Sequence, residues 1–159
     1  FSWCARHGRT PAGTSTGMID MSRTHVHKVH VEFGDCDPAG IVWFPNFFRW
    51  VDASSRHFFR VCGVPPWQET VKTHGIIGTP LVETRASFHR PASYGDDIEV
   101  HSSIEAWSAK SFRMAHRIRR GDVLLAEIVE KRVFAARHPD DATRMVAVPI
   151  PEDFRARCD

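Results

Sequence analysis

Two aspartates and a glycine precede the start of a helix in the segment Asp35-Cys36-Asp37-Pro38-Ala39-Gly40-Ile41-Val42-Trp43-Phe44-Pro45-Asn46. Proline is favoured at the first position of a helix, so Pro45 predicts a helix start, and Gly63 predicts the end of that helix. The apolar residues between them cover much more than a narrow stripe: Phe47, Phe48, Trp50, Val51, Ala53, Phe58, Phe59, Val61 and Cys62. We therefore expect one long helix from Pro45 to Cys62, with most of its surface buried at the centre of the fold.

Strand patterns lie on both sides of this helix. Residues 26–33 alternate imperfectly between apolar and polar side chains, which predicts a half-buried strand. After the helix we predict short helices at 68–74 and from residue 149 onward, and four strands at 79–91, 97–108, 110–120 and 123–137. A strand, a buried helix and a run of antiparallel strands predict an α+β fold in which one sheet curls around one helix.

The length and composition fit a single globular domain. The chain has 159 residues, of which 42% are hydrophobic, and its formal net charge of +2 argues against a nucleic-acid-binding surface. Residues 1–24 are rich in Gly, Ser and Thr and lack periodicity, which predicts a flexible N-terminal extension before a domain at 25–159. No apolar run is long enough to span a membrane, and the four cysteines are widely spaced, which favours reduced thiols in the cytoplasm.

Three other patterns are weaker candidates for a functional site. Gly13-Thr14-Ser15-Thr16-Gly17 matches the nucleophile-elbow motif of serine hydrolases but lacks the flanking strand and helix that this motif requires. His25 and His27 share one face of the first predicted strand and His30 falls on the other, so an exposed strand is favoured over a metal site. Cys36 lies between two aspartates, which oppose the formation of a thiolate. We expect neither a metal nor a cofactor.

The segment from Asp35 to Val42 has two interpretations. Aspartate before a helix is ordinary in an Asx turn or a helix cap, which is a purely structural role. However, Gly40 permits a ligand to approach the backbone closely, and the N–H groups at a helix start stabilise an anion. The second interpretation places a carboxylate beside a group that binds an oxyanion, which is the arrangement that acyl transfer requires.

The segment from Asp35 to Asn46 closely resembles the active-site segment of the 4-hydroxybenzoyl-CoA thioesterase family. The resemblance covers roughly residues 28 to 155 and includes the segments 49–53, 62–67, 78–80, 92–94 and 110–112. It implies a hot-dog fold, in which an antiparallel sheet wraps a long helix. It also implies a homodimer that completes each active site between two subunits, commonly within a homotetramer, and hydrolysis of an aromatic acyl-CoA without a cofactor.

Carried over position by position, the resemblance identifies Asp37 as the catalytic carboxylate, acting either as a nucleophile or as a general base. Phe44 matches the position whose backbone N–H polarises the thioester carbonyl, and because the backbone does this, Phe is expected to replace the family's Tyr. Asp52, Trp67 and Thr79 match residues of the acyl pocket. For Asp52 and Trp67 the alternative is a structural role, as a solvated helix residue and as a cap on the core.

The residues expected to bind coenzyme A depart from the family pattern. The family carries a basic cluster where Ser108 and Ala109 here precede Lys110. Lys110 is therefore the expected CoA-binding residue, with Arg113, Arg117 or residues of a neighbouring subunit as candidates for further phosphate contacts.

Other functions of the same fold are the alternatives. A hot-dog hydratase requires a His five residues after the first Asp of its motif, and this chain has Gly40 there. A thioesterase for short aliphatic acyl-CoA and a noncatalytic acyl-CoA-binding subunit both remain open. The expected function is hydrolysis of an aromatic acyl-CoA such as 4-hydroxybenzoyl-CoA.

Overall fold

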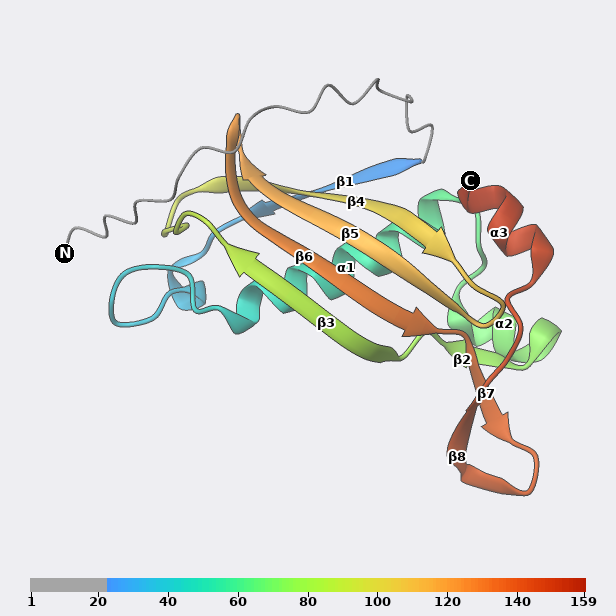
Figure 1. Ribbon diagram of the computed structural model, residues 1–159. Coiled ribbons are helices and arrows are strands. Elements are labelled where there is room, and N and C mark those ends of the chain that lie inside the picture. The colour runs from blue at the N-terminus through green and yellow to red at the C-terminus, as the bar shows by residue number, and fades with distance from the viewer. Residues whose placement is uncertain (1–22) are drawn as a thin grey trace, which may run out of the picture.

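The computed structural model describes residues 23–159, so all but the last two residues of the predicted extension at 1–24, including its whole Gly13–Gly17 motif, lie outside the described part. A five-stranded antiparallel sheet with the order β1-β4-β5-β6-β3 curls around the long helix α1 (Pro45–Val61). In Figure 1 this helix crosses behind the sheet, so one face of the sheet covers α1 and the other faces outward. This is the α+β hot-dog architecture that the sequence predicts.

The main sheet has five strands, and the three central ones alternate between buried and less buried residues because one face of each lies on the helix. The five strands are β1 (Thr24–His30), β3 (Leu81–Phe88), β4 (Asp97–Trp107), β5 (Ser111–Arg120) and β6 (Val123–Val133). In β5, for example, Phe112, Met114, His116 and Ile118 are buried, and the residues that alternate with them are not. The two edges of the sheet are β1 and β3.

Two strand predictions need correction. The first strand ends at His30, and residues Phe33–Asp35 instead form a 3-10 turn, η1, that leads into the Asp35–Asn46 segment. The predicted strand 123–137 is two strands, because the buried Phe134 leaves the main sheet and its N–H donates to Lys110 O (3.0 Å). After it, β7 (Ala135–His138) pairs with β2 (Ile76–Gly78) and β8 (Asp141–Ala147) in a small second sheet, part of which projects as a hairpin in Figure 1.

Helix α1 is amphipathic rather than buried over most of its surface, which corrects the sequence-based expectation. Its buried residues follow the 3-then-1 spacing of a single helical stripe, and Val61, outside that stripe, is exposed. The stripe is not purely apolar, because two serines occupy its middle. The buried residues are Phe47, Trp50, Val51, Ser54, Ser55, Phe58 and Phe59.

The core is correspondingly divided into two apolar clusters. One surrounds Trp50 and Val51 near the start of α1, and the other surrounds Phe58 and Phe59 near its end. Short helices α2 (Trp67–His74) and α3 (Glu152–Cys158) lie close to the expected positions, and buried Phe154 joins α3 to the second cluster. Within residues 23–159, no helix is long and apolar enough to cross a membrane.

Candidate active site

Asp37 lies in a tight turn just before α1. Its N–H donates to Ile41 O (2.9 Å), and Gly40 N–H donates to Asp37 O (2.9 Å). Gly40 has a φ of 77°, in the left-handed region that other residues enter only with strain. The Asp37 carboxylate accepts a hydrogen bond from Ala39 N–H (2.8 Å) and stays half-exposed. The Asx turn and a carboxylate open to a ligand are thus both present, so the two interpretations of this segment do not exclude each other.

Asp35, the other aspartate of the segment, is a structural residue. Its carboxylate is buried and accepts hydrogen bonds from Arg49 Nη2 (2.6 Å) and from Glu32 N–H (3.0 Å). Its carbonyl oxygen accepts from Trp43 N–H (2.9 Å) and from the Asn46 side chain (2.8 Å). These bonds fasten the turn that carries Asp37 to the first two turns of α1.

The backbone N–H of Phe44 is a free donor at the start of the helix. The next N–H groups along the chain are used locally: Asn46 N–H donates to Trp43 O (2.9 Å). Phe47 N–H donates to Phe44 O (3.1 Å), and Pro45 carries no N–H. In the described part of the chain Phe44 N–H has no acceptor, so it is available at the positive end of the helix dipole.

Asp52 and Thr79, two of the expected pocket residues, are brought together by Arg132. The Arg132 guanidinium donates to Asp52 Oδ1 (2.9 Å) from Nη2 and to Thr79 O (3.2 Å) from Nη1. Asp52 also lies 3.6 Å from Arg56 Nε, one turn further along α1. The Asp52 carboxylate is half-exposed, so it remains accessible to a ligand.

A buried polar network continues from Arg132 into the core, and sequence reasoning did not identify it. Arg132 binds both oxygens of Glu130, which is only 2% exposed, with Nε 2.8 Å from Oε2. Ser55 Oγ also donates to Glu130 Oε2 (3.1 Å), and His116 Nε2 lies 3.4 Å from the same oxygen. His116 Nδ1 is 2.7 Å from Ser102 Oγ. The network fills the layer between the two apolar clusters.

The alternation of inward-facing and outward-facing residues along β5 and β6 indicates this network in the sequence. Glu130 and Arg132 stand on the same face of β6 as the buried Ala126 and Ile128, two positions apart in each case. His116 occupies the equivalent inward face of β5. A charged residue at an inward position of a strand requires a buried partner, so this spacing is a signal in the sequence for an internal ion pair, one that the sequence analysis did not use.

Burial alone would raise the pKa of Glu130, because it penalises the charged carboxylate. The interactions with His116 and Arg132 more than reverse this and lower the pKa of Glu130 to about 2. Glu130 is therefore ionised at neutral pH and holds the Arg132 guanidinium in place. Through Arg132 it also fixes the positions of Asp52 and Thr79.

Trp67, the remaining expected pocket residue, lies beyond the opposite end of α1 from Asp37. Its ring packs edge-on against Phe59, with 6.1 Å between the ring centroids. Together with Arg56 and Arg60 it lines a cavity of about 510 Å³. Since α1 is about 25 Å long, Trp67 and Asp37 are not neighbours within one chain.

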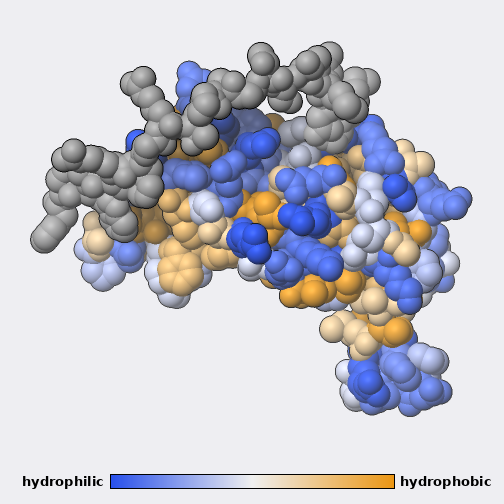
Figure 2. Space-filling model, viewed as in Figure 1, coloured by the Kyte–Doolittle hydropathy of each residue, from blue (hydrophilic) through white to orange (hydrophobic). Residues whose placement is uncertain are grey.

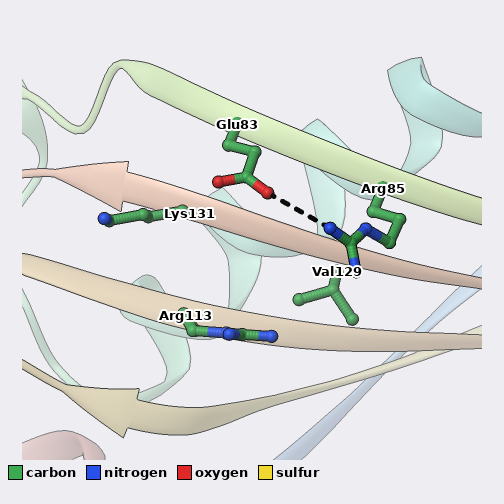
Figure 3. Close-up of a pocket in the computed structure, with 5 residues that line it drawn as sticks. All are labelled: Glu83, Arg85, Arg113, Val129 and Lys131. Carbon is green, nitrogen blue, oxygen red and sulfur yellow. Dashed lines mark ion pairs between the residues drawn. The ribbon is translucent and has the colours of Figure 1, made fainter.

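Lys110, the expected CoA-binding residue, is exposed in the turn between β4 and β5. Beyond it, Arg113 points outward from β5 beside a hollow of about 170 Å³ on the outer face of the sheet. Figure 3 shows this hollow between Arg113, Arg85 and Lys131, with Glu83 paired to Arg85 at 3.9 Å. The outer face therefore carries a group of basic side chains that Lys110 adjoins along the chain.

The site residues thus fall into separate groups within one chain. Asp37 and Phe44 lie at the N-terminal end of α1, and Asp52 and Thr79 are held together by Arg132. Trp67, the first residue of α2, lies beyond the C-terminal end of α1.

Comparison with known proteins identifies the family. Residues 31–158 match the family model described as the thioesterase-like superfamily. The 4-hydroxybenzoyl-CoA thioesterase of Pseudomonas sp. (strain CBS-3) is 46% identical over 143 residues, which is 87% of this chain and 99% of that protein.

Solved structures agree with this match. A mutant 4-hydroxybenzoyl-CoA thioesterase complexed with 4-hydroxybenzoyl-CoA superposes with a TM-score of 0.82 at 43% identity, covering 87% of this chain and all of that one. A gentisyl-coenzyme A thioesterase superposes with a TM-score of 0.70 at 32% identity, covering 84% of this chain and 98% of that one. From the family model, the sequence identity and the shared fold, we conclude that this chain belongs to the thioesterase-like superfamily.

Proposed function

We propose that this protein hydrolyses an aromatic acyl-CoA thioester of the 4-hydroxybenzoyl type to the free acid and coenzyme A. The observation that carries the proposal is a half-exposed Asp37 carboxylate on a fixed turn, followed by the free N–H of Phe44 at a helix start. The substrate class is supported by the 46% identity to a 4-hydroxybenzoyl-CoA thioesterase. It is also supported by a similar structure, 43% identical, that holds 4-hydroxybenzoyl-CoA.

Asp37 acts on the thioester in one of two ways. As a nucleophile, its carboxylate attacks the carbonyl carbon, the C–S bond breaks, and coenzyme A leaves as a thiolate that takes up a proton. Water then hydrolyses the mixed anhydride and regenerates the carboxylate. As a general base, Asp37 instead removes a proton from a water molecule that attacks the carbonyl directly.

In both routes negative charge develops on the thioester oxygen, and Phe44 N–H is the donor that stabilises it. The N-terminal end of α1 adds a partial positive charge at the same place. Loss of a single oxyanion donor typically lowers kcat by about a hundredfold to a thousandfold. Because the donor belongs to the backbone, a Phe side chain at this position is compatible with the chemistry.

The two ends of the substrate contact different groups. Asp52 and Thr79 hydrogen-bond a hydroxyl group on the ring, and Arg132 holds them in position. Trp67 contributes apolar surface to the pocket, next to the cavity at the end of α1. Lys110, with Arg113 on the following strand, binds the phosphates of coenzyme A as point charges, which requires less exact geometry than a bidentate site.

A homodimer, assembling further into a homotetramer, is part of the proposal. Strand β3 is an edge of the main sheet, and its apolar Leu81, Val82 and Phe88 are exposed in the single chain. Apolar surface is visible along the lower edge of the molecule in Figure 2, where Figure 1 draws β3. An exposed apolar edge strand favours pairing with another chain. A second subunit would also bring Asp52 and Trp67 of one chain to Asp37 of the other.

The proposed location is the cytoplasm. Cys36, Cys62 and Cys158 are free thiols in the described part of the chain, as expected in a reducing compartment.

The proposal is tested by measuring the release of free thiol from 4-hydroxybenzoyl-CoA, benzoyl-CoA and acetyl-CoA. Asn in place of Asp37 preserves the Asx turn but not the charge, so Asp37→Asn is expected to lower kcat at least about a thousandfold. Asp141→Asn is a matched control, because Asp141 also accepts a hydrogen bond from the N–H two residues later (3.0 Å) but lies on the projecting hairpin. Its kcat should equal that of the wild type.

Each other outcome identifies an alternative. Equal rates for Asp37→Asn and the wild type would refute the catalytic role of Asp37. Turnover restricted to acetyl-CoA would favour the aliphatic thioesterase, and binding of acyl-CoA without turnover would favour a noncatalytic subunit.

A further inference from the structure

Three histidines from two elements meet at the end of α1 that is remote from Asp37. His25 and His27 are alternate residues of β1 and are half-buried on its helix-facing side, whereas His30 is exposed on the opposite side. His57 reaches them from α1, about 18 Å along the helix axis from Pro45. The sequence alone favours an exposed strand because His30 falls on the opposite face from His25 and His27, and nothing in the sequence places His57 beside them.

The three rings are arranged around one point. His27 Nδ1 lies 3.1 Å from His57 Nδ1. One ligand nitrogen from each of the three histidines lies within 4.8 Å of the other two. Three nitrogens around a tetrahedral Zn²⁺ ion lie about 3.4 Å apart, given Zn–N bonds of roughly 2.0–2.1 Å. Small rotations of the side chains therefore suffice to place all three nitrogens on one ion.

The burial and the pKa shifts of the histidine rings are also consistent with binding of a metal ion. His25 Nε2 is buried and has no hydrogen-bond partner among the described residues, which is a costly arrangement for a polar atom. Burial, together with the nearby ring of His57, lowers the pKa of His25 and of His27. A lowered pKa favours the neutral imidazole, which is the form that binds a metal.

We propose that His25, His27 and His57 form a binding site for one Zn²⁺ ion, or for another divalent metal that prefers imidazole, with water as the fourth ligand. Imidazole suits zinc, copper and nickel rather than magnesium or calcium. The ion joins edge strand β1 to the C-terminal half of α1. Within one chain the ion lies far from Asp37, and because it ties a strand to the helix we assign it a structural role, although His57 also lines the cavity beside Trp67.

The experiment uses the untagged full-length chain, stripped with a chelator and titrated with ZnCl₂ in a calorimeter at neutral pH. We expect one Zn²⁺ per chain and a rise in Tm when the ion is added. His27→Ala and His57→Ala are expected to weaken binding by more than about a hundredfold, since loss of a ligand costs more than loss of an outer-shell partner. His30→Ala is the matched control, on the same strand but the opposite face, and should bind Zn²⁺ as the wild type does.

A second measurement does not depend on whether the variants fold. Co²⁺ added to the stripped wild-type protein should give the visible absorption bands of tetrahedral cobalt with nitrogen ligands. Sulfur-to-cobalt charge-transfer bands, or the weak spectrum of octahedral cobalt, would overturn the assignment. The proposal is also overturned if the wild type takes up no Zn²⁺, or if His27→Ala and His57→Ala bind it with unchanged affinity.

Discussion

At the scale of single residues, the position of Asp37 depends on the backbone of Gly40. An L-residue in the left-handed conformation costs roughly 1–2 kcal/mol, and a Cβ at Gly40 would meet no atom within 4 Å, so this cost is the only direct one. We predict that Gly40→Ala lowers the free energy of unfolding by about 1 kcal/mol and lowers kcat, because relief of the strain moves the turn that carries Asp37. Denaturant unfolding and thiol release measure the two effects.

Gly75 provides the control for Gly40. It ends α2 with a φ of 67° and likewise has open space where a Cβ would stand. Gly75→Ala should therefore cost a similar amount of stability but leave kcat unchanged. Equal loss of kcat in both variants would mean that the effect of Gly40→Ala is general destabilisation rather than displacement of Asp37.

At the scale of secondary-structure elements, the sequence predicted those helices and strands whose bounds depend on local sequence patterns. The helix from Pro45 follows from its proline start and its apolar spacing, and β4 and β5 were placed to within a residue or two at each end. The end of β6 at Val133 was missed, because Phe134 turns into the core only through contacts with distant segments. The small second sheet was also missed, since its strands are short and β2 pairs with β7 across a large separation in sequence.

The candidate site likewise includes contacts that follow from local sequence and contacts that do not. Asp37 and Phe44 are seven residues apart on one segment, so their proximity follows from the sequence and from its resemblance to a known family. Arg132 contacts Asp52 across 80 positions, and no local pattern predicts that contact. The meeting of His57 with β1 likewise depends on how the helix lies under the sheet.

Glu130 of β6 lies against α1 and β5, and its ionisation predicts how the stability of the folded protein depends on pH. The pKa of Glu130 falls from 4.5 to about 2 on folding, so its ionised form stabilises the folded state. That contribution is complete above pH 4.5 and is lost as the pH falls towards 2, and it amounts to about 3 kcal/mol. The urea midpoint of the wild type should therefore fall steeply over this range of pH.

Glu130→Gln removes this source of pH dependence and leaves Arg132 without its buried counter-ion. We expect the variant to lose about 3–5 kcal/mol at neutral pH, the usual cost of breaking a buried ion pair. Its urea midpoint should change less between pH 4.5 and pH 2 than that of the wild type. An identical pH dependence in both proteins would show that the carboxylates responsible lie elsewhere.

At the scale of the whole molecule, the separation of Asp37 from Asp52 and Trp67 leads to a test of how subunits share a site. Asp37→Asn and Asp52→Ala each disable every site of a homomer, by loss of the chemistry and by loss of a pocket contact. If each site combines Asp37 of one subunit with Asp52 of the other, a mixed dimer holds one intact site and one that lacks both groups. Random mixing makes half of the dimers mixed, so about a quarter of wild-type kcat/KM should return.

The two variants are therefore to be unfolded together, refolded as a mixture and assayed with 4-hydroxybenzoyl-CoA at low concentration. Light scattering after size exclusion should give two or four times the chain mass of 18.1 kDa, which verifies that dimers are present. If the mixture is no more active than the mean of its two components, Asp37 and Asp52 act within one chain. In that case the exposed edge of β3 serves assembly alone, and the active site does not require it.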